Sequence, residues 1–259
     1  MEPERDIAGR QSQGDRPYQE DYYQVAIEDA LGVRGGDLLV VVADGMGGHA
    51  AGDIASRVAT ENFLREFSES LDVDTVRLSK GLRGANEAIR KLCEEEPQTY
   101  SGMGTTLVAA FLRDNMLRWT SIGDSTLYHF SRASKQFKRL NDDHSMAPIL
   151  AAQVERGEMT AEDAENHPDR NVLRSAIIGE PLTEGALDQG KPPVEVEKGD
   201  MIIVATDGLD TLPLEKLRAT IEIHEASDAS VVCKQLIQTV ESRRKDRQDN
   251  ITVVVFRVV

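Results

Sequence analysis

The sequence predicts an α+β fold, in which a central antiparallel β-sandwich is flanked by pairs of α-helices and carries a flap insertion. Short apolar runs rich in β-branched residues recur along the 259-residue chain, as in strands that are buried on both faces. Amphipathic helical segments separate these runs. Blocks of strands with hairpins among them, separated by helices, are typical of helices stacked on a largely antiparallel sandwich.

The first part of the chain predicts one buried strand and two long helices. Residues 38–43 (Leu-Leu-Val-Val-Val-Ala) form a strand pattern that ends at Asp44-Gly45. Residues 53 to about 71 and 74 to about 96 place their apolar side chains mostly on one face, with helical spacing.

The middle of the chain predicts a meander and then an insertion. Residues 105–111 and 116–122 flank Arg113-Asp114-Asn115, which predicts a β-hairpin, and residues 127–130 continue it. Residues 147–180 contain only short helical stretches and loop-like sequence. We expect this segment to lie over the sheet as a flap subdomain that covers the substrate.

The last part repeats the strand pattern. Residues 201–205 (Met-Ile-Ile-Val-Ala) again end in Asp-Gly, residues 228 to about 243 predict a third helix, and residues 251–256 predict a strand. Acidic segments lie near both ends of the chain and must meet. We therefore expect a single domain that spans residues 1–259.

Composition limits the function. With 30 Lys and Arg against 45 Asp and Glu, the net charge is −15, which argues against binding to nucleic acid or to an anionic membrane. The N-terminus lacks a signal-peptide core, and no segment approaches the roughly 20 apolar residues that span a bilayer. Cys93 and Cys233 suit neither a disulfide framework nor a zinc site. We expect a cytoplasmic monomer.

Four short segments place a carboxylate beside an apolar run. They are Arg16-Pro17-Tyr18-Gln19-Glu20-Asp21, Asp44-Gly45-Met46-Gly47-Gly48-His49, Thr206-Asp207-Gly208 and Gln248-Asp249-Asn250. Carboxylates that are buried together repel one another unless divalent cations neutralise them. Oxygen ligands without His or Cys favour Mg²⁺ or Mn²⁺ over Zn²⁺. Each Asp-Gly pair by itself also fits an ordinary turn.

Seven motifs in a fixed order resemble the metal-dependent protein phosphatases of type 2C, and the resemblance runs from Arg16 to Val255. The motifs are Arg-x-x-x-Glu-Asp at 16–21, Asp-Gly-Met-Gly-Gly-His at 44–49, Gly-Thr-Thr at 104–106, Gly-Asp-Ser at 123–125, Asp-His-Ser at 143–145, Asp-Gly-Leu at 207–209 and Asp-Asn at 249–250. The Met-Gly-Gly-His form is similar to that of the bacterial branch.

The resemblance implies a set of metal ligands. Asp44 bridges two Mn²⁺ or Mg²⁺ ions, and Gly45 lends its carbonyl oxygen. The remaining ligands are Asp207 and Asp249 on one ion, and Glu20 and Asp21 through waters on the other. Two such ions turn a bridging water into a hydroxide that attacks the phosphorus atom in line.

Three further residues have competing interpretations. Arg16 is the expected phosphate anchor, because a guanidinium offers two parallel donors; the alternative is a surface arginine paired with a neighbouring acid. Asp124 resembles the family residue that binds a third ion with Asp207, or is a plain turn residue. His49 protonates the leaving oxygen or contacts substrate, or it caps the helix that starts near Asp53.

The leading hypothesis is a protein phosphatase that hydrolyses phosphoserine and phosphothreonine, with phosphorylated proteins as partners, among them a cognate serine/threonine kinase and its substrates. One alternative is an inactive phosphoprotein-binding module, which has no need of the full carboxylate set. The other is a phosphatase of small phosphoesters or nucleotides. Residues 45–48 lack the Lys-Ser/Thr ending of a nucleotide phosphate loop.

Overall fold

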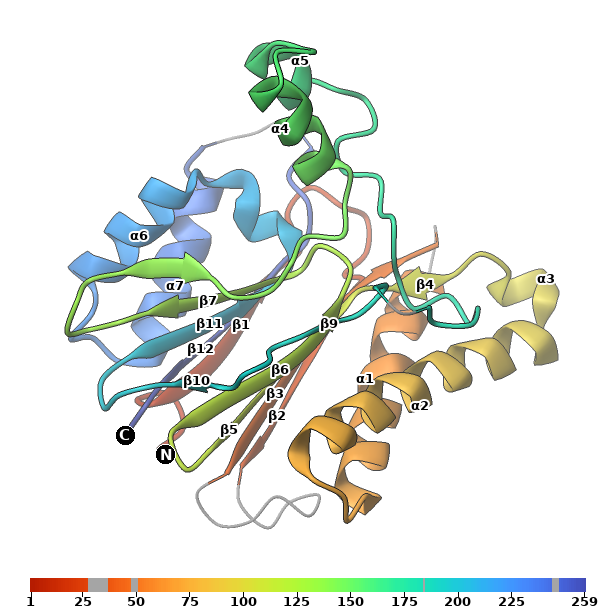
Figure 1. Ribbon diagram of the computed structural model, residues 1–259, viewed down its shortest axis with the longest axis horizontal. Helices are drawn as coiled ribbons and strands as arrows, with labels where there is room; N and C mark the ends of the chain where they lie inside the picture. The colour runs from red at the N-terminus through yellow and green to blue at the C-terminus, as the bar shows by residue number, and fades with distance from the viewer. Residues whose placement is uncertain (28–36, 48–50, 184, 244–246) are drawn as a thin grey trace.

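Two antiparallel sheets pack face to face in the computed structural model, which describes residues 1–27, 37–47, 51–183, 185–243 and 247–259 (Figure 1). The first sheet has the order β1 (Ile7–Ser12), β12 (Ile251–Arg257), β11 (Met201–Ala205), β7 (Thr126–Phe130) and β8 (Phe137–Arg139). The second has the order β10 (Val194–Glu195), β6 (Met116–Ile122), β5 (Leu107–Arg113), β3 (Leu38–Met46) and β2 (Asp21–Ile27). Short strands β4 (Gly104–Thr105) and β9 (Asp188–Gln189) pair with β3 and β6.

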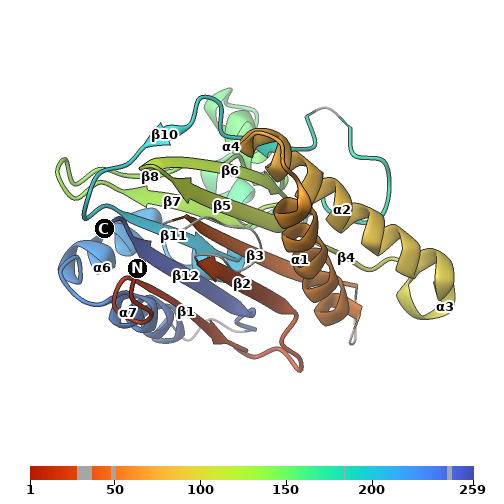
Figure 2. The ribbon, with the colours of Figure 1, turned by 90° about the horizontal axis from the view of Figure 1, so that it is seen from below.

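Two helix pairs cover the outer faces of the sandwich (Figure 2). Helices α1 (Ala51–Glu69) and α2 (Asp74–Glu95) pack on the second sheet, and α6 (Leu214–Ile223) and α7 (Ala229–Glu241) pack on the first. The short helix α3 (Pro97–Tyr100) follows α2. None of the described helices is long and apolar enough to cross a membrane. The predicted α+β sandwich is confirmed.

Both faces of the central strands are buried, which explains their uninterrupted apolar sequences. Along β3, Leu39 and Val41 pack under α1 and α2, whereas Val40 and Val42 point into the layer between the two sheets. All four side chains are fully buried. The strands predicted at 116–122 and 201–205 have the observed bounds, and those at 38–43 and 251–256 fall within observed strands.

Several predicted bounds change. The strand predicted at 105–111 is divided between β4 and β5, because Thr106 bonds to the end of β3 through its backbone and side chain. The hairpin loop is only Asp114 and Asn115, with φ of +52° and +59°, the conformation of a tight primed turn. Strands β1 and β2 and helix α6 were not predicted.

The strand register brings the acidic segments to one end of the sandwich. Asp21 lies directly opposite Asp44 in the β2–β3 pair. On the other sheet, Ala205 at the end of β11 pairs with Val253 near the start of β12 and with Thr126 at the start of β7. Residues that directly flank these strand ends therefore meet.

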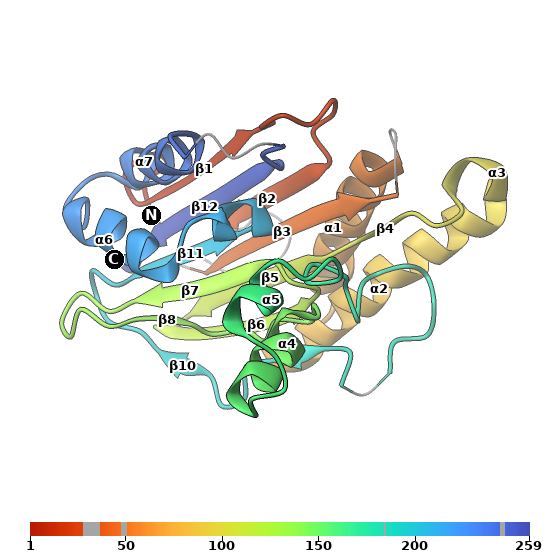
Figure 3. The same cartoon turned by 90° about the horizontal axis from the view of Figure 1, so that it is seen from above.

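Residues 147–180 project from this same end. They contain α4 (Ala147–Glu155) and α5 (Ala161–Glu165), which stand above the sheets in Figure 1 and overlie them in Figure 3. Only Leu150 and Ile177 of this segment are buried. The segment thus makes few core contacts, as expected of an insertion.

Candidate active site

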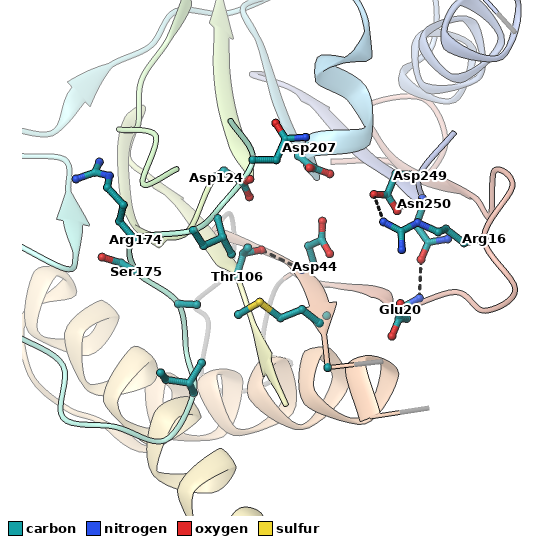
Figure 4. Close-up of a pocket in the computed structure, with 17 residues that line it drawn as sticks. Arg16, Glu20, Asp44, Thr106, Asp124, Arg174, Ser175, Asp207, Asp249 and Asn250 are labelled. Carbon is teal, nitrogen blue, oxygen red and sulfur yellow. Dashed lines mark hydrogen bonds and ion pairs between the residues drawn. The ribbon is translucent and has the colours of Figure 1, made fainter. Parts of the chain in front are cut away.

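A pocket of about 590 Å³ opens at the end of the sandwich where the acidic segments meet (Figure 4). It collects most of the predicted site residues from both sheets: Arg16, Glu20, Asp44, Gly45, Asp124, Asp207 and Asp249. An adjoining pocket of about 310 Å³ shares Arg16, Asp124, Asp207 and Asp249. Asp21 does not line either pocket, and His49 lies outside the described residues.

Asp44 is held in the pocket by its own backbone. Its N–H donates to Thr106 Oγ1 at 3.0 Å, and its carbonyl oxygen accepts from Thr106 N at 2.9 Å and from Thr105 Oγ1 at 2.8 Å. The carboxylate points into the pocket in Figure 4. Burial raises its pKa well above the usual value, and repulsion from Asp21 and Asp207 raises the pKa further.

Gly45 is required by a close approach of three chain segments. A Cβ at this position would lie 2.0 Å from the carbonyl oxygen of Gly52 and 2.6 Å from that of Glu20. Only glycine allows the end of β3 to come so near to α1 and to the loop before β2.

Asp207 and Asp124 line the interior of the pocket, whereas Arg16 and Asp249 lie at its rim. Asp207 begins the 3₁₀ helix η2 (Asp207–Thr211) directly after β11, and Asp124 lies in the turn between β6 and β7. Burial, followed by repulsion from neighbouring aspartates, raises the pKa of Asp207 to about 6 and that of Asp124 to about 8. These carboxylates are therefore costly to ionise without a cation beside them.

Asp21 lies behind the pocket wall. One carboxylate oxygen accepts from Thr206 Oγ1 at 2.9 Å and from Thr252 Oγ1 at 2.8 Å, whereas the other has no hydrogen-bond partner. Burial raises its pKa to about 7 despite the two hydroxyl donors. The structure thus places Asp21 in a layer between Asp44 and the first sheet.

The segment that carries Glu20 is tied to the opposite end of the chain. Asn250 accepts from the Glu20 N–H at 2.8 Å, and its side-chain amide donates to the carbonyl oxygens of Gln13 and Tyr18. The Glu20 carboxylate lines the pocket, and one of its oxygens is buried without a partner.

Arg16 and Asp249 are paired with each other. Arg16 Nη2 lies 2.6 Å from Asp249 Oδ2, and both side chains are partly exposed at 48% and 38%. Of the two interpretations of Arg16, the structure therefore shows the ion pair with a neighbouring acid. The contact occupies one nitrogen of the Arg16 guanidinium and one oxygen of the Asp249 carboxylate.

The donor set fits a hard divalent cation. Glu20 and Asp207 each have a buried carboxylate oxygen without a hydrogen-bond donor, and such oxygens are the usual ligands of Mg²⁺ and Mn²⁺. Within the ranges that the structure describes, no three acidic, imidazole or thiol groups already converge on one point.

The roles of Thr106, Asn250 and the individual pocket-lining residues of the 147–180 segment are not predictable from local sequence pattern. Thr106 and Asn250 do belong to the Gly-Thr-Thr and Asp-Asn motifs, and this membership is the one signal that points to them. Asn171, Leu173, Arg174, Ser175, Ala176 and Ile178 line the pocket from that segment. No local sequence signal distinguishes them from the rest of the insertion.

Comparisons with known proteins agree with this geometry. A family model described as Protein phosphatase 2C matches residues 17–248. The serine/threonine phosphatase stp of Listeria innocua is 31% identical over 222 residues, which cover 84% of this chain and 83% of that protein. The serine/threonine protein phosphatase PstP of Mycobacterium tuberculosis is 32% identical over 229 residues, or 88% of this chain and 41% of that protein. The crystal structure of the PstP catalytic domain in complex with two manganese ions has a TM-score of 0.75 and 28% identity, and covers 98% of this chain and 97% of that one.

Proposed function

Because the chain belongs to the protein phosphatase 2C family, we propose that it hydrolyses phosphoserine and phosphothreonine in proteins with two Mn²⁺ or Mg²⁺ ions. The observation that carries this proposal is the set of carboxylates from both sheets that converges on one pocket with Arg16 at its rim. Their raised pKa values and unpartnered oxygens support a site that is completed by cations.

We assign the ligands by position. Asp44, the carbonyl oxygen of Gly45, Asp207 and Asp249 would hold the ions directly, and Glu20 would contribute through water. Asp21, which lies behind Asp44, would act through water or by orienting Asp44. Asp124, together with Asp207, would hold a third ion. When bound, the ions lower the pKa of water and neutralise the phosphoryl oxygens.

The chain's own residues orient the substrate and keep the ligands in place. Arg16 binds two phosphate oxygens once Asp249 has turned away from it. Thr106 fixes the backbone of Asp44, and Asn250 fixes the loop that carries Glu20. For His49, the roles of proton donor and of helix cap both remain open to test.

Replacing Asp44 tests the assignment. Asp44→Asn should lower kcat on a phosphothreonine peptide by about a thousandfold, because several kcal/mol of electrostatic stabilisation are lost. The fold should persist, as measured by circular dichroism. Asp169→Asn is the matched control, since Asp169 is an exposed carboxylate of the 147–180 segment that does not line the pocket. Equal turnover by wild type and Asp44→Asn refutes the assignment.

We further propose that the protein is a single domain of residues 1–259, with residues 147–180 as its flap. We propose that it acts as a monomer in the cytoplasm, on a cognate serine/threonine kinase and that kinase's substrates. The unpaired Cys93 and Cys233 support a reducing compartment. Light scattering tests the monomer, and phosphoproteomes with and without the gene test the substrates.

A further inference from the structure

We propose that Met46, Leu173 and Ile178 form a surface, the apolar shelf, that receives an apolar side chain of the substrate polypeptide next to its phosphorylated residue. This inference rests on the proposed phosphatase function. It adds a preference among phosphorylated proteins that the acidic centre alone does not provide.

The pocket has two chemically different sides. Carboxylates and Arg16 occupy one side, and the 171–178 segment brings Leu173 and Ile178 to the cavity together with the polar Asn171, Arg174 and Ser175. In Figure 4, Arg174 and Ser175 lie across the pocket from Arg16 and Asp249, so the 171–178 segment faces the acidic centre. A volume of about 590 Å³ is within the range of about 300–1,000 Å³ found for sites that enclose drug-sized molecules. A phosphoryl group alone leaves most of it unfilled.

Two side chains of the shelf, those of Met46 and Ile178, lie side by side because both pack on one glycine. A Cβ at Gly104 would lie 2.7 Å from Ile178 Cγ2 and 2.9 Å from Met46 Cε. Both side chains therefore rest on the backbone of Gly104. Met46 and Leu173 are half-buried, and Ile178 is 41% exposed. Apolar carbon thus faces the cavity beside the carboxylates.

The backbone on both sides of Ile178 is tied to the core. Ile177 is fully buried and exchanges two hydrogen bonds of 2.9 Å with Thr105. Gly179 donates to Asn86 Oδ1 on α2 at 3.0 Å. Ile178 is therefore exposed on a segment whose backbone is held by hydrogen bonds on both sides. A surface that is formed in advance loses little conformational entropy when a ligand binds.

The chemistry of the pocket selects the occupant. An apolar side chain beside the phosphorylated residue gains from leaving water where it contacts Met46, Leu173 and Ile178, whereas these three side chains offer no hydrogen-bond donor to an acidic one. A small phosphoester has no second group to reach the shelf. An apolar neighbour of the phosphorylated residue satisfies both sides of the pocket.

Two phosphothreonine peptides test the shelf with the Mn²⁺-loaded enzyme. They differ only at the two residues that flank phosphothreonine, which are leucine in one and glycine in the other. For the wild type we expect kcat/KM to be about tenfold higher with the leucine peptide, which corresponds to part of the burial of one leucine side chain. Ile178→Ser should bring this ratio close to one, and Ile178→Leu should retain it.

Val172→Ser is the matched control. Val172 is an apolar residue of the same segment, 51% exposed, that does not line the pocket, so this variant should keep the wild-type ratio. A wild-type ratio near one, or a ratio that survives Ile178→Ser, overturns the shelf. An equal loss with both peptides in Ile178→Ser also overturns it, because that is the signature of a structural role. If the wild type hydrolyses neither peptide with Mn²⁺ present, the proposed function fails first, and the shelf fails with it.

Discussion

An aspartate stands at each end of strand β3, the buried Asp37 just before it and the half-buried Asp44 near its end, and their surroundings are opposite in charge. At the start of β3, Asp37 accepts from Arg113 Nε at 2.9 Å. Arg113 also contacts Asp74, which has Arg77 and Arg118 3.7 Å away. Three arginines thus neutralise two carboxylates there.

At the other end of β3, Asp44 faces more carboxylates. Asp21, Asp124 and Asp207 all repel it, and its pKa is raised. Arg16 is near, but it pairs with Asp249 at the rim. The comparison teaches that a buried carboxylate is not by itself a functional signal. What marks the site is the shortage of cations, which bound metal ions would supply.

Removing an arginine from the balanced end should have the largest effect on stability. Arg113→Ala removes the two hydrogen bonds from Arg113 to Asp37 and its ion pair with Asp74, which costs about 3 kcal/mol of unfolding free energy because these carboxylates are buried or nearly so. Urea denaturation measures this loss. Arg65→Ala is the control, because the exposed Arg65–Glu66 pair should contribute less than about 0.5 kcal/mol. If Arg113→Ala loses less than about 1 kcal/mol of unfolding free energy, the arginines around Asp37 do not stabilise their end of β3 as the comparison with Asp44 requires.

Removing a carboxylate near Asp44, where acidic groups outnumber cations, should instead stabilise the protein. In the metal-free protein, Asp124→Asn should raise the unfolding free energy by about 2 kcal/mol at pH 8, because the ionised form of this buried group is disfavoured. With saturating Mn²⁺ the same variant should gain little or lose stability, since a ligand is missing. Destabilisation of the metal-free variant would contradict the comparison.

The pH dependence of the metal-free protein should follow the same charges. The pKa values of Asp207, Asp21 and Asp124 are raised to about 6, 7 and 8 in the folded chain. The folded chain therefore keeps protons that the unfolded chain has released. Stability from these groups is complete below their unfolded pKa of about 4. Each group then costs about 1 kcal/mol per pH unit until the pH reaches its own folded pKa, so the contribution of Asp207 levels off near pH 6, that of Asp21 near pH 7 and that of Asp124 near pH 8. Melting temperatures in EDTA should fall from pH 5.5 to 8, and Mn²⁺ should reduce the fall. A melting temperature in EDTA that does not change between pH 5.5 and 8 would argue against an excess of carboxylates over cations in the pocket.

The smallest effect on stability is expected at the rim. Arg16→Ala breaks a partly exposed pair and should cost at most about 0.5 kcal/mol, while phosphopeptide hydrolysis falls because the phosphate loses its anchor. Urea denaturation and steady-state kinetics on one preparation separate the two effects. If Arg16→Ala destabilises the protein as strongly as Arg113→Ala, Arg16 is a structural partner of Asp249.

Sequence reasoning succeeded where local sequence determines the outcome. The buried strands were recognisable because both of their faces are apolar, and the acids stood at strand ends. Strand β1 (Ile-Ala-Gly-Arg-Gln-Ser) and strand β2 lack such runs, because their side chains are only partly buried. The Arg16–Asp249 pair and the depth of Asp21 were also out of reach. Both depend on residues more than 180 positions away in sequence, which only the tertiary fold brings together.

The hydrogen bonds of Asn250 have a consequence for biosynthesis. They connect the loop of Glu20 to Asn250 at the start of β12, across a sequence separation of 230 residues. Gly45 and Ser56 also bond to the carbonyl oxygen of Glu20, but these two residues come early in the chain. Because translation proceeds from the N-terminus, the bonds of Asn250 form only after β12 has been made. The pocket therefore cannot be completed before this strand has been synthesised.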